Sequence, residues 1–246
     1  MSESDARPLV LLNSLGTTNA LWDDVAPLLA KSFDVVRFDQ RGHGTAAAAP
    51  PATRLDDLVD DLFDVLDRLD VEFAHLAGIS IGGMIALRAA SREPDRVLSL
   101  TAMCCAAVLD RQSWLERAAT VRERGLEPIV PAVMARWFTP EFRGRRPDVV
   151  RTYEDMLRST PPEGYAMGCD VLADADVRGD LAAIKAPTLV IGGAADPATP
   201  PPEQRAIAGA IAHARLEILP DVGHLAPVAA PETVAKLVLD NAKRSA

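Results

Sequence analysis

Short apolar runs, each bounded by Gly, Asp or Pro, recur along the chain. They have the length of buried β-strands and are too short for typical helices. The runs cover residues 9–13, 35–39, 73–78, 97–103, 188–192 and 215–219. Between the second and third runs, apolar residues repeat at helical spacing over 55–69, and aspartates fill much of the opposite face. This stretch is predicted to be an amphipathic helix.

Strands and helices continue to alternate, with further helices predicted at 82–92, 202–212 and 231–243. Such alternation is typical of right-handed crossovers in a parallel sheet. We therefore predict an α/β fold with a mostly parallel, doubly wound sheet and helices on both faces. The alternation stops over 109–182, where helix-length segments carry two tryptophans and several arginines. The chain is accordingly divided into a first core part (1–108), an inserted helical lid (109–182) and a second core part (183–246).

Composition narrows the class of protein. A chain of 246 residues with 48% hydrophobic residues can bury a large core. Its formal net charge of -9 disfavours nucleic acid and anionic membranes as partners. The first eight residues lack the apolar stretch of a signal peptide, and no apolar run approaches the roughly 18 residues of a membrane span, so a cytoplasmic location is expected. The three cysteines show no C-x-x-C pair, and no metal is assigned.

Residues 78–83 read Gly-Ile-Ser-Ile-Gly-Gly between a strand run and a helix run. A G-x-S-x-G sequence in this context is typical of a nucleophile elbow, a strained turn that lifts the serine out of the sheet. Glycines are needed there because the turn is crowded by its neighbours. We predict that Ser80 is a nucleophile.

Serine hydroxyl is a weak nucleophile and needs an imidazole base that a carboxylate orients. Asp196 follows the strand at 188–192, and His224 follows the strand at 215–219. The order Ser, Asp, His and the position after strands match this kind of site. His43, His75 and His213 lie in a turn, in a strand and at a helix end, and are weaker candidates for the base.

Attack by Ser80 creates an oxyanion that needs fixed hydrogen-bond donors. One donor is expected from the backbone N–H of Ile81, the residue after the nucleophile. The second is expected from the loop after the first strand, where the chain reads Asn-Ser-Leu-Gly-Thr-Thr over 13–18. We assign it to the N–H of Leu15.

Several stretches together resemble 3-oxoadipate enol-lactonases of the α/β-hydrolase superfamily, over nearly the whole chain. The stretches are 13–16 (NSLG), 39–44 (DQRGHG), 78–83 (GISIGG), 137–142 (WFTPEF), 162–165 (PEGY), 174–178 (DADVR) and 196–201 (DPATPP). The resemblance implies hydrolysis of the enol-lactone to 3-oxoadipate in the bacterial breakdown of aromatic compounds (the beta-ketoadipate pathway), with no cofactor. The partner implied is a small lactone or ester.

A carboxylate on such a substrate calls for a local cation, and arginine binds carboxylates in a bidentate geometry. Arg136, beside Trp137 in the predicted lid, is the nearest candidate in the sequence. The Trp137 ring would then form an apolar wall of the pocket. A solvated arginine next to a core tryptophan is the alternative interpretation.

The resemblance weakens at the start of the chain, where relatives of this fold carry an antiparallel hairpin before the first strand. Only eight residues precede Leu9, so the hairpin is expected to be missing. The strand at 35–39 would then lie near an open edge of the sheet, which needs covering or pairs with another chain. A homo-oligomer or a truncated gene start would account for this.

Other functions remain open at this stage. The same three residues serve a general carboxylesterase or a lactonase for another ring, because the pocket and not the triad selects the substrate. A third interpretation is a homologue that binds a ligand without hydrolysing it.

Overall fold

The apolar runs form one parallel sheet in the computed structural model, which describes residues 7–245. Six strands in this range are ordered β2-β1-β3-β4-β5-β6, and every pair is parallel. The strands are β1 (Arg7–Leu12), β2 (Phe33–Arg37), β3 (Ala74–Ile79), β4 (Val97–Met103), β5 (Thr188–Gly193) and β6 (Arg215–Leu219). The predicted α/β fold is confirmed. Strand β2 lies at one edge of the sheet, and pairing of this edge with a second copy stays a prediction.

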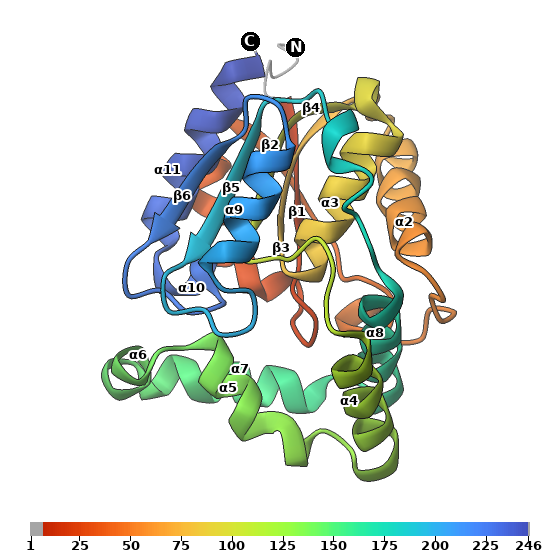
Figure 1. Cartoon of the computed structure of the whole chain (residues 1–246), viewed down its shortest axis with the longest axis vertical. Helices are drawn as coiled ribbons and strands as arrows, with labels where there is room; N and C mark the ends of the chain where they lie inside the picture. The colour runs from red at the N-terminus through yellow and green to blue at the C-terminus, as the bar shows by residue number, and fades with distance from the viewer. Residues whose placement is uncertain (1–6, 246) are drawn as a thin grey trace.

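Helices cover both faces of the sheet (Figure 1). On one face, α2 (Leu55–Arg68), α3 (Ile81–Arg92) and α9 (Pro201–Ala210) pack against one another or against the central strands. On the other face, α11 (Pro231–Ala242) packs against β4, β5 and α1 (Ala26–Leu29). The short α10 (Ala226–Ala229) precedes α11. No helix within residues 7–245 combines the length and apolarity needed to cross a membrane.

Helix α2 forms as its pattern predicts. Its apolar stripe is buried, comprising Leu55, Leu58, Val59, Leu62, Phe63 and Leu66. The Asp57 carboxylate accepts the backbone N–H of Arg54 at 3.0 Å, which satisfies a donor at the start of the helix. Each buried leucine contributes about 2 kcal/mol through removal of apolar surface from water. The helix therefore depends on packing more than on its own propensity.

Strand β2 corrects the sequence prediction, which placed it two residues later along the chain. It ends at Arg37 because Phe38 and Asp39 leave the ladder for other partners. The Phe38 carbonyl accepts the side-chain N–H of Asn13 at 3.0 Å. The Asp39 carboxylate accepts the backbone N–H groups of Asn19 at 2.6 Å and Thr45 at 2.8 Å. These bonds turn the chain toward the loops at the carboxyl end of the sheet.

Five α-helices lie between β4 and β5 in the sequence, at the carboxyl end of the sheet (Figure 1). We call residues 111–174 the cap; its helices are α4 (Arg111–Arg124), α5 (Val130–Trp137), α6 (Pro140–Arg145), α7 (Pro147–Ser159) and α8 (Pro162–Asp174). Helices α4 and α8 pack along each other. A Cβ on Gly164 of α8 would overlap the carbonyl of Gly42, so glycine permits the cap to approach the core this closely. The three-part division of the chain stays a prediction.

Candidate active site

A cavity of about 230 Å³ lies between the carboxyl end of the sheet and the cap. Its lining brings together residues that are far apart in the sequence, including Ser14, Leu15, Ser80, Ile81, Cys105, Trp114, Arg117, Arg136, Trp137, Tyr165 and His224. Six of the seven residues predicted for the site are in this lining. The seventh, Asp196, is buried behind it, bonded to His224.

Ser80 lies in the sharp turn between β3 and α3. Its backbone has φ 58° and ψ -123°, a conformation that L residues rarely adopt. The Ser80 N–H donates to the Met103 carbonyl at 2.9 Å, and the Gly82 N–H donates to the Asn13 carbonyl at 3.1 Å. A Cβ on Gly78 would overlap the Gly82 carbonyl, so this turn requires glycine. The side chain makes no capping bond to α3, and the half-buried residue lines the cavity.

His224 and Asp196 are joined by a hydrogen bond of 2.8 Å between Nδ1 and Oδ2. The side chain of Asp196 is fully buried and that of His224 nearly so. Because the carboxylate accepts from Nδ1–H, the lone pair of Nε2 is left free. No hydrogen bond joins His224 to Ser80 within residues 7–245, although both line the cavity. Such bonds often tighten only when substrate binds.

Asp196 is held as an anion by several donors. Burial alone would raise its pKa, but the charge and hydrogen bond of His224, with bonds from Thr199 and Ala198, hold the pKa below its ordinary value. Thr199 Oγ1 donates to Oδ2 at 2.7 Å, and the Ala198 N–H donates to Oδ1 at 2.8 Å. Gln204 in turn donates to the Thr199 carbonyl at 3.0 Å. The carboxylate therefore keeps its charge and its orientation at neutral pH.

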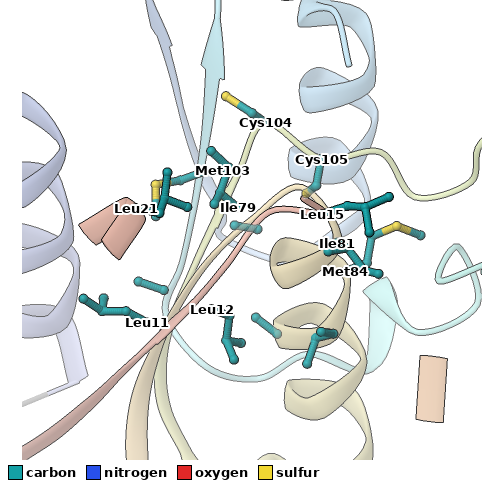
Figure 2. Close-up of a cluster of buried hydrophobic side chains, with 14 of the residues drawn as sticks. Leu11, Leu12, Leu15, Leu21, Ile79, Ile81, Met84, Met103, Cys104 and Cys105 are labelled. Carbon is teal, nitrogen blue, oxygen red and sulfur yellow. The ribbon is translucent and has the colours of Figure 1, made fainter. Parts of the chain in front are cut away.

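Leu15 and Ile81 lie at the cavity wall near the first turn of α3. Figure 2 shows their side chains together with those of Met84 and Cys105. In the described part of the chain, neither the Leu15 N–H nor the Ile81 N–H has a hydrogen-bond acceptor. Unpaired amides next to a serine hydroxyl are suited to binding a developing oxyanion.

The sequence analysis considered His43 only as a weak candidate for the base, and the structure gives it a different role. Its Nε2 accepts the backbone N–H of Gly16 at 3.0 Å, and its Nδ1 lies 3.3 Å from the Arg41 carbonyl. The ring is fully buried, and burial lowers its pKa to about 4. A neutral His43 therefore holds the residue that follows Leu15. The sequence signal was a histidine between two glycines in a turn, which alone does not indicate its partner.

Arg136 and Trp137 form the last turn of α5. The carbonyls of these two residues accept the backbone N–H groups of His224 and Leu225, both at 3.2 Å. These bonds satisfy the free carbonyls at the end of the helix and join the cap to the loop that carries His224. The Trp137 ring is buried and packs edge-on against Tyr153, with 6.3 Å between ring centroids.

Arg117, Trp114 and Tyr165 line the cavity from α4 and α8, and the sequence analysis did not name them as site residues. The Arg117 guanidinium lies over the Trp114 ring, 4.5 Å from its centroid. Residues i and i+3 share one face of a helix, so the spacing of Trp114 and Arg117 was a usable signal. Tyr165 was visible only as part of the PEGY motif.

The cysteines are poorly suited to nucleophilic chemistry. Cys104, Cys105 and Cys169 are free and buried. Burial raises the pKa of Cys105 to about 12, so the thiol stays protonated and is a poor nucleophile. Across residues 7–245, no group of three His, Cys, Asp or Glu side chains is arranged to hold a metal ion.

Comparisons with known proteins agree with this architecture. A model of the alpha/beta hydrolase fold matches residues 7–231. The 3-oxoadipate enol-lactonase 2 of Acinetobacter baylyi is 36% identical over 231 residues, which are 94% of this chain and 86% of that protein. The 3-oxoadipate enol-lactonase 1 of the same organism is also 36% identical, over 93% of this chain and 85% of its own length.

Solved structures give the same result. The crystal structure of the enol-lactonase from Burkholderia xenovorans LB400 superposes with a TM-score of 0.94 at 34% identity, covering 97% of this chain and 92% of that one. A thermophilic esterase from Thermogutta terrifontis superposes with a TM-score of 0.92 at 27% identity, covering 98% and 90%. The chain therefore belongs to the alpha/beta hydrolases, within the 3-oxoadipate enol-lactonase family, and is a hydrolase of ester bonds.

Proposed function

We propose that this hydrolase opens 3-oxoadipate enol-lactone to 3-oxoadipate, with Ser80 as nucleophile, His224 as base and Asp196 as the residue that orients the base. The main support for this proposal is that one cavity is lined by Ser80, His224, Leu15 and Ile81, and that the N–H groups of the last two are unpaired. The names of the relatives supply the choice of lactone. The place of the reaction in the breakdown of aromatic compounds is part of this proposal.

The first half of the reaction opens the ring. His224 Nε2 takes the Ser80 proton while Oγ forms a bond to the lactone carbonyl carbon. The carbonyl oxygen becomes an oxyanion, which the Leu15 and Ile81 N–H groups bind. When the tetrahedral intermediate collapses, the ring C–O bond breaks and the leaving enol oxygen takes the proton from His224. The enol stays attached to the acyl group, and its ketonisation makes reclosure unfavourable.

The second half releases the product. His224 takes a proton from water, and the hydroxide attacks the acyl carbon bound to Ser80. Collapse of this second intermediate breaks the bond to Oγ and returns the proton to the serine. Asp196 stabilises the imidazolium at each half reaction, because its carboxylate accepts the Nδ1–H at 2.8 Å.

The cap supplies the rest of the pocket. Trp137 provides an apolar wall for the ring of the substrate, and the half-buried Arg136 provides positive charge for a carboxylate. The backbone carbonyls of these same two residues accept the bonds that join α5 to the His224 loop. A substrate held by their side chains would lie close to the base.

A second candidate is a general carboxylesterase. The likeness to the Thermogutta terrifontis esterase favours it, because the two backbones superpose over almost their whole length. The same triad chemistry applies to an acyclic ester, with an alcohol in place of the tethered enol as leaving group.

The deciding experiment is hydrolysis of freshly generated enol-lactone, followed by the loss of its ultraviolet absorbance, beside simple esters and saturated lactones. We expect kcat/KM for the enol-lactone to exceed that for every simple ester. Activity on simple esters alone would move the function to a general esterase. Absence of any turnover would leave a ligand-binding homologue as the explanation.

A further inference from the structure

A second serine, Ser14, contributes a buried hydroxyl to the active-site cavity. The residue lies in the loop after β1 and is only 1% exposed. Another buried hydroxyl of the cavity, that of Thr199, is used to bind Asp196. The Ser14 hydroxyl, in contrast, has no hydrogen-bond partner within residues 7–245, where the bonds of this residue are made by its backbone. The hydroxyl is therefore available to a ligand.

The Ser14 oxygen is also open to the cavity. In the part of the chain that the structure describes, three side-chain polar atoms are both sealed from solvent and without a hydrogen bond; they belong to Arg88, Asp180 and Gln204. The unpaired Ser14 oxygen is not one of them, so it reaches the cavity surface. A hydroxyl in such a partly desolvated place forms a strong bond when a ligand supplies the partner.

Covalent geometry places this hydroxyl beside one of the oxyanion donors. Four bonds separate Ser14 Oγ from the backbone nitrogen of Leu15, so the two atoms lie within about 5 Å of each other in any rotamer. The Leu15 N–H has no acceptor among the described residues. An oxygen atom that accepts this N–H is within reach of the Ser14 O–H, which can rotate to donate to the same atom.

The backbone that carries the Ser14 hydroxyl is held in place. The Ser14 carbonyl accepts the Thr17 N–H at 3.2 Å and the Thr17 Oγ1–H at 2.8 Å. Two residues further along the chain, the Gly16 N–H donates to His43 Nε2 at 3.0 Å. Because the loop is already ordered, the serine side chain alone has to be fixed when a ligand binds, which keeps the entropic cost small.

We propose that Ser14 is a further catalytic residue, whose hydroxyl donates a third hydrogen bond to the oxyanion, beside the N–H groups of Leu15 and Ile81. The inference rests on the proposed function and deepens it, because it adds a side-chain donor to the two backbone donors. In each half reaction the former carbonyl oxygen carries the negative charge, and the Ser14 O–H stabilises that charge. The hydroxyl keeps its own proton, so His224 remains the group that transfers protons.

The test is Ser14→Ala, which removes the oxygen and keeps the Cβ. Because the hydroxyl has no partner in the free protein, the urea midpoint of unfolding is expected to stay unchanged or to rise. We expect kcat to fall by about 10- to 100-fold for the enol-lactone and for 4-nitrophenyl acetate, the range for a hydrogen bond to a charged group. KM is expected to change by less than about threefold, because the bond forms with the charge that develops in the transition state.

Thr17→Val is the matched control in the same loop. It removes a hydroxyl that does have a partner, the Ser14 carbonyl. We expect this variant to lower the urea midpoint and to reduce kcat less than Ser14→Ala does. The two variants should therefore rank in opposite orders for stability and for kcat, which distinguishes an oxyanion donor from a residue that only shapes the loop.

Inhibition by phenylboronic acid gives a second readout. Its boron accepts the Ser80 oxygen, and a boron-bound oxygen then takes the place of the oxyanion. Ser14→Ala should raise the inhibition constant by about the same factor as it lowers kcat/KM. The inference is overturned by an unchanged kcat, by a loss confined to KM, by an unchanged inhibition constant, or by an equal loss of kcat in Thr17→Val.

The two proposals fail in different ways. If the wild type opens the enol-lactone and Ser14→Ala retains its kcat, the proposed function stands and the role of Ser14 is rejected. If the wild type hydrolyses 4-nitrophenyl acetate but not the enol-lactone, the choice of lactone is rejected. The effect of Ser14→Ala is then measured on the ester, since every acyl substrate passes through an oxyanion.

Discussion

His43 and His75 are both buried, but they serve opposite ends of the sheet. His75 lies near the start of β3, where its Nδ1 is 2.8 Å from Ser99 Oγ on β4 and its ring packs edge-on against Phe33. His43 lies in the loop after β2 and accepts the N–H of Gly16. Burial lowers the pKa of each to about 4. Burial and a lowered pKa therefore do not distinguish a histidine that stabilises the sheet from one that supports the active site. The hydrogen-bond partner of each ring makes this distinction.

Substitution of Ser80 and Ser99, which lie at these opposite ends of the sheet, is expected to give the largest difference in kcat. Ser80→Ala removes the nucleophile, and kcat is expected to fall by at least about 10⁴-fold while the fold persists. Ser99→Ala is expected to keep kcat and to lower the free energy of unfolding by about 1–3 kcal/mol, because His75 loses its buried partner. Steady-state kinetics and urea unfolding measure the two effects. Full activity of Ser80→Ala would reject the triad.

Asp196→Asn is expected to have the next largest effect. The amide can donate to His224 Nδ1, which favours the wrong tautomer and leaves no lone pair on Nε2. We expect a loss of about 10³- to 10⁴-fold in kcat, as for the corresponding change in serine proteases. Thr199→Val, which removes one donor to the same carboxylate, is the matched control and is expected to lose about 10-fold or less. Equal losses in the two variants would argue against an orienting role for Asp196.

The two histidines themselves provide the third test. His43→Leu removes the acceptor of the Gly16 N–H, and the oxyanion loop is expected to shift. Since one oxyanion donor accounts for about 10²- to 10³-fold in kcat, a displaced donor should cost about 10- to 100-fold, mainly in kcat and not in KM. His43→Gln, whose carbonyl oxygen can accept the same N–H, is expected to recover part of the loss.

His75→Leu is the matched control for that test, because it removes an equally buried ring from the other end of the sheet. We expect kcat within about twofold of the wild type, as the nearest strands keep their ladder. If His43→Leu and His75→Leu had the same kinetics, His43 would be a scaffold residue like His75.

The sequence predicted the sheet well because buried parallel strands read as short apolar runs with little ambiguity. Strands β4 and β6 begin and end as predicted. Strand β2 was displaced because its end depends on Asn13 and Asp39, whose partners lie in other loops. The local sequence pattern does not show which distant residues will form such bonds.

The residues of the candidate site also fall into those that the sequence predicts and those that it does not. Ser80, Asp196 and His224 could be predicted because the fold places them after particular strands in a particular order. His43 could not, because its role depends on a hydrogen bond from the N–H of Gly16, which lies 27 residues away in the sequence. Spacing along one helix or turn identifies neighbours within an element, and cross-element contacts need the folded chain.

The smallest expected effect is on the pH dependence of stability, and here the two histidines should behave alike. Each has a pKa of about 4 when folded, against an ordinary value of 6.5. As the pH falls, the unfolded chain takes up the proton first, so stability is retained above pH 6.5 and lost toward pH 4. Between pH 7 and pH 6, each histidine should remove about 0.7 kcal/mol from the free energy of unfolding.

Urea unfolding of His43→Leu and His75→Leu at both pH values should show this loss reduced by the same amount in each. If this loss were reduced in only one variant, the two rings would differ in protonation. A difference in kcat between the two variants could then no longer be attributed to the hydrogen-bond partners alone.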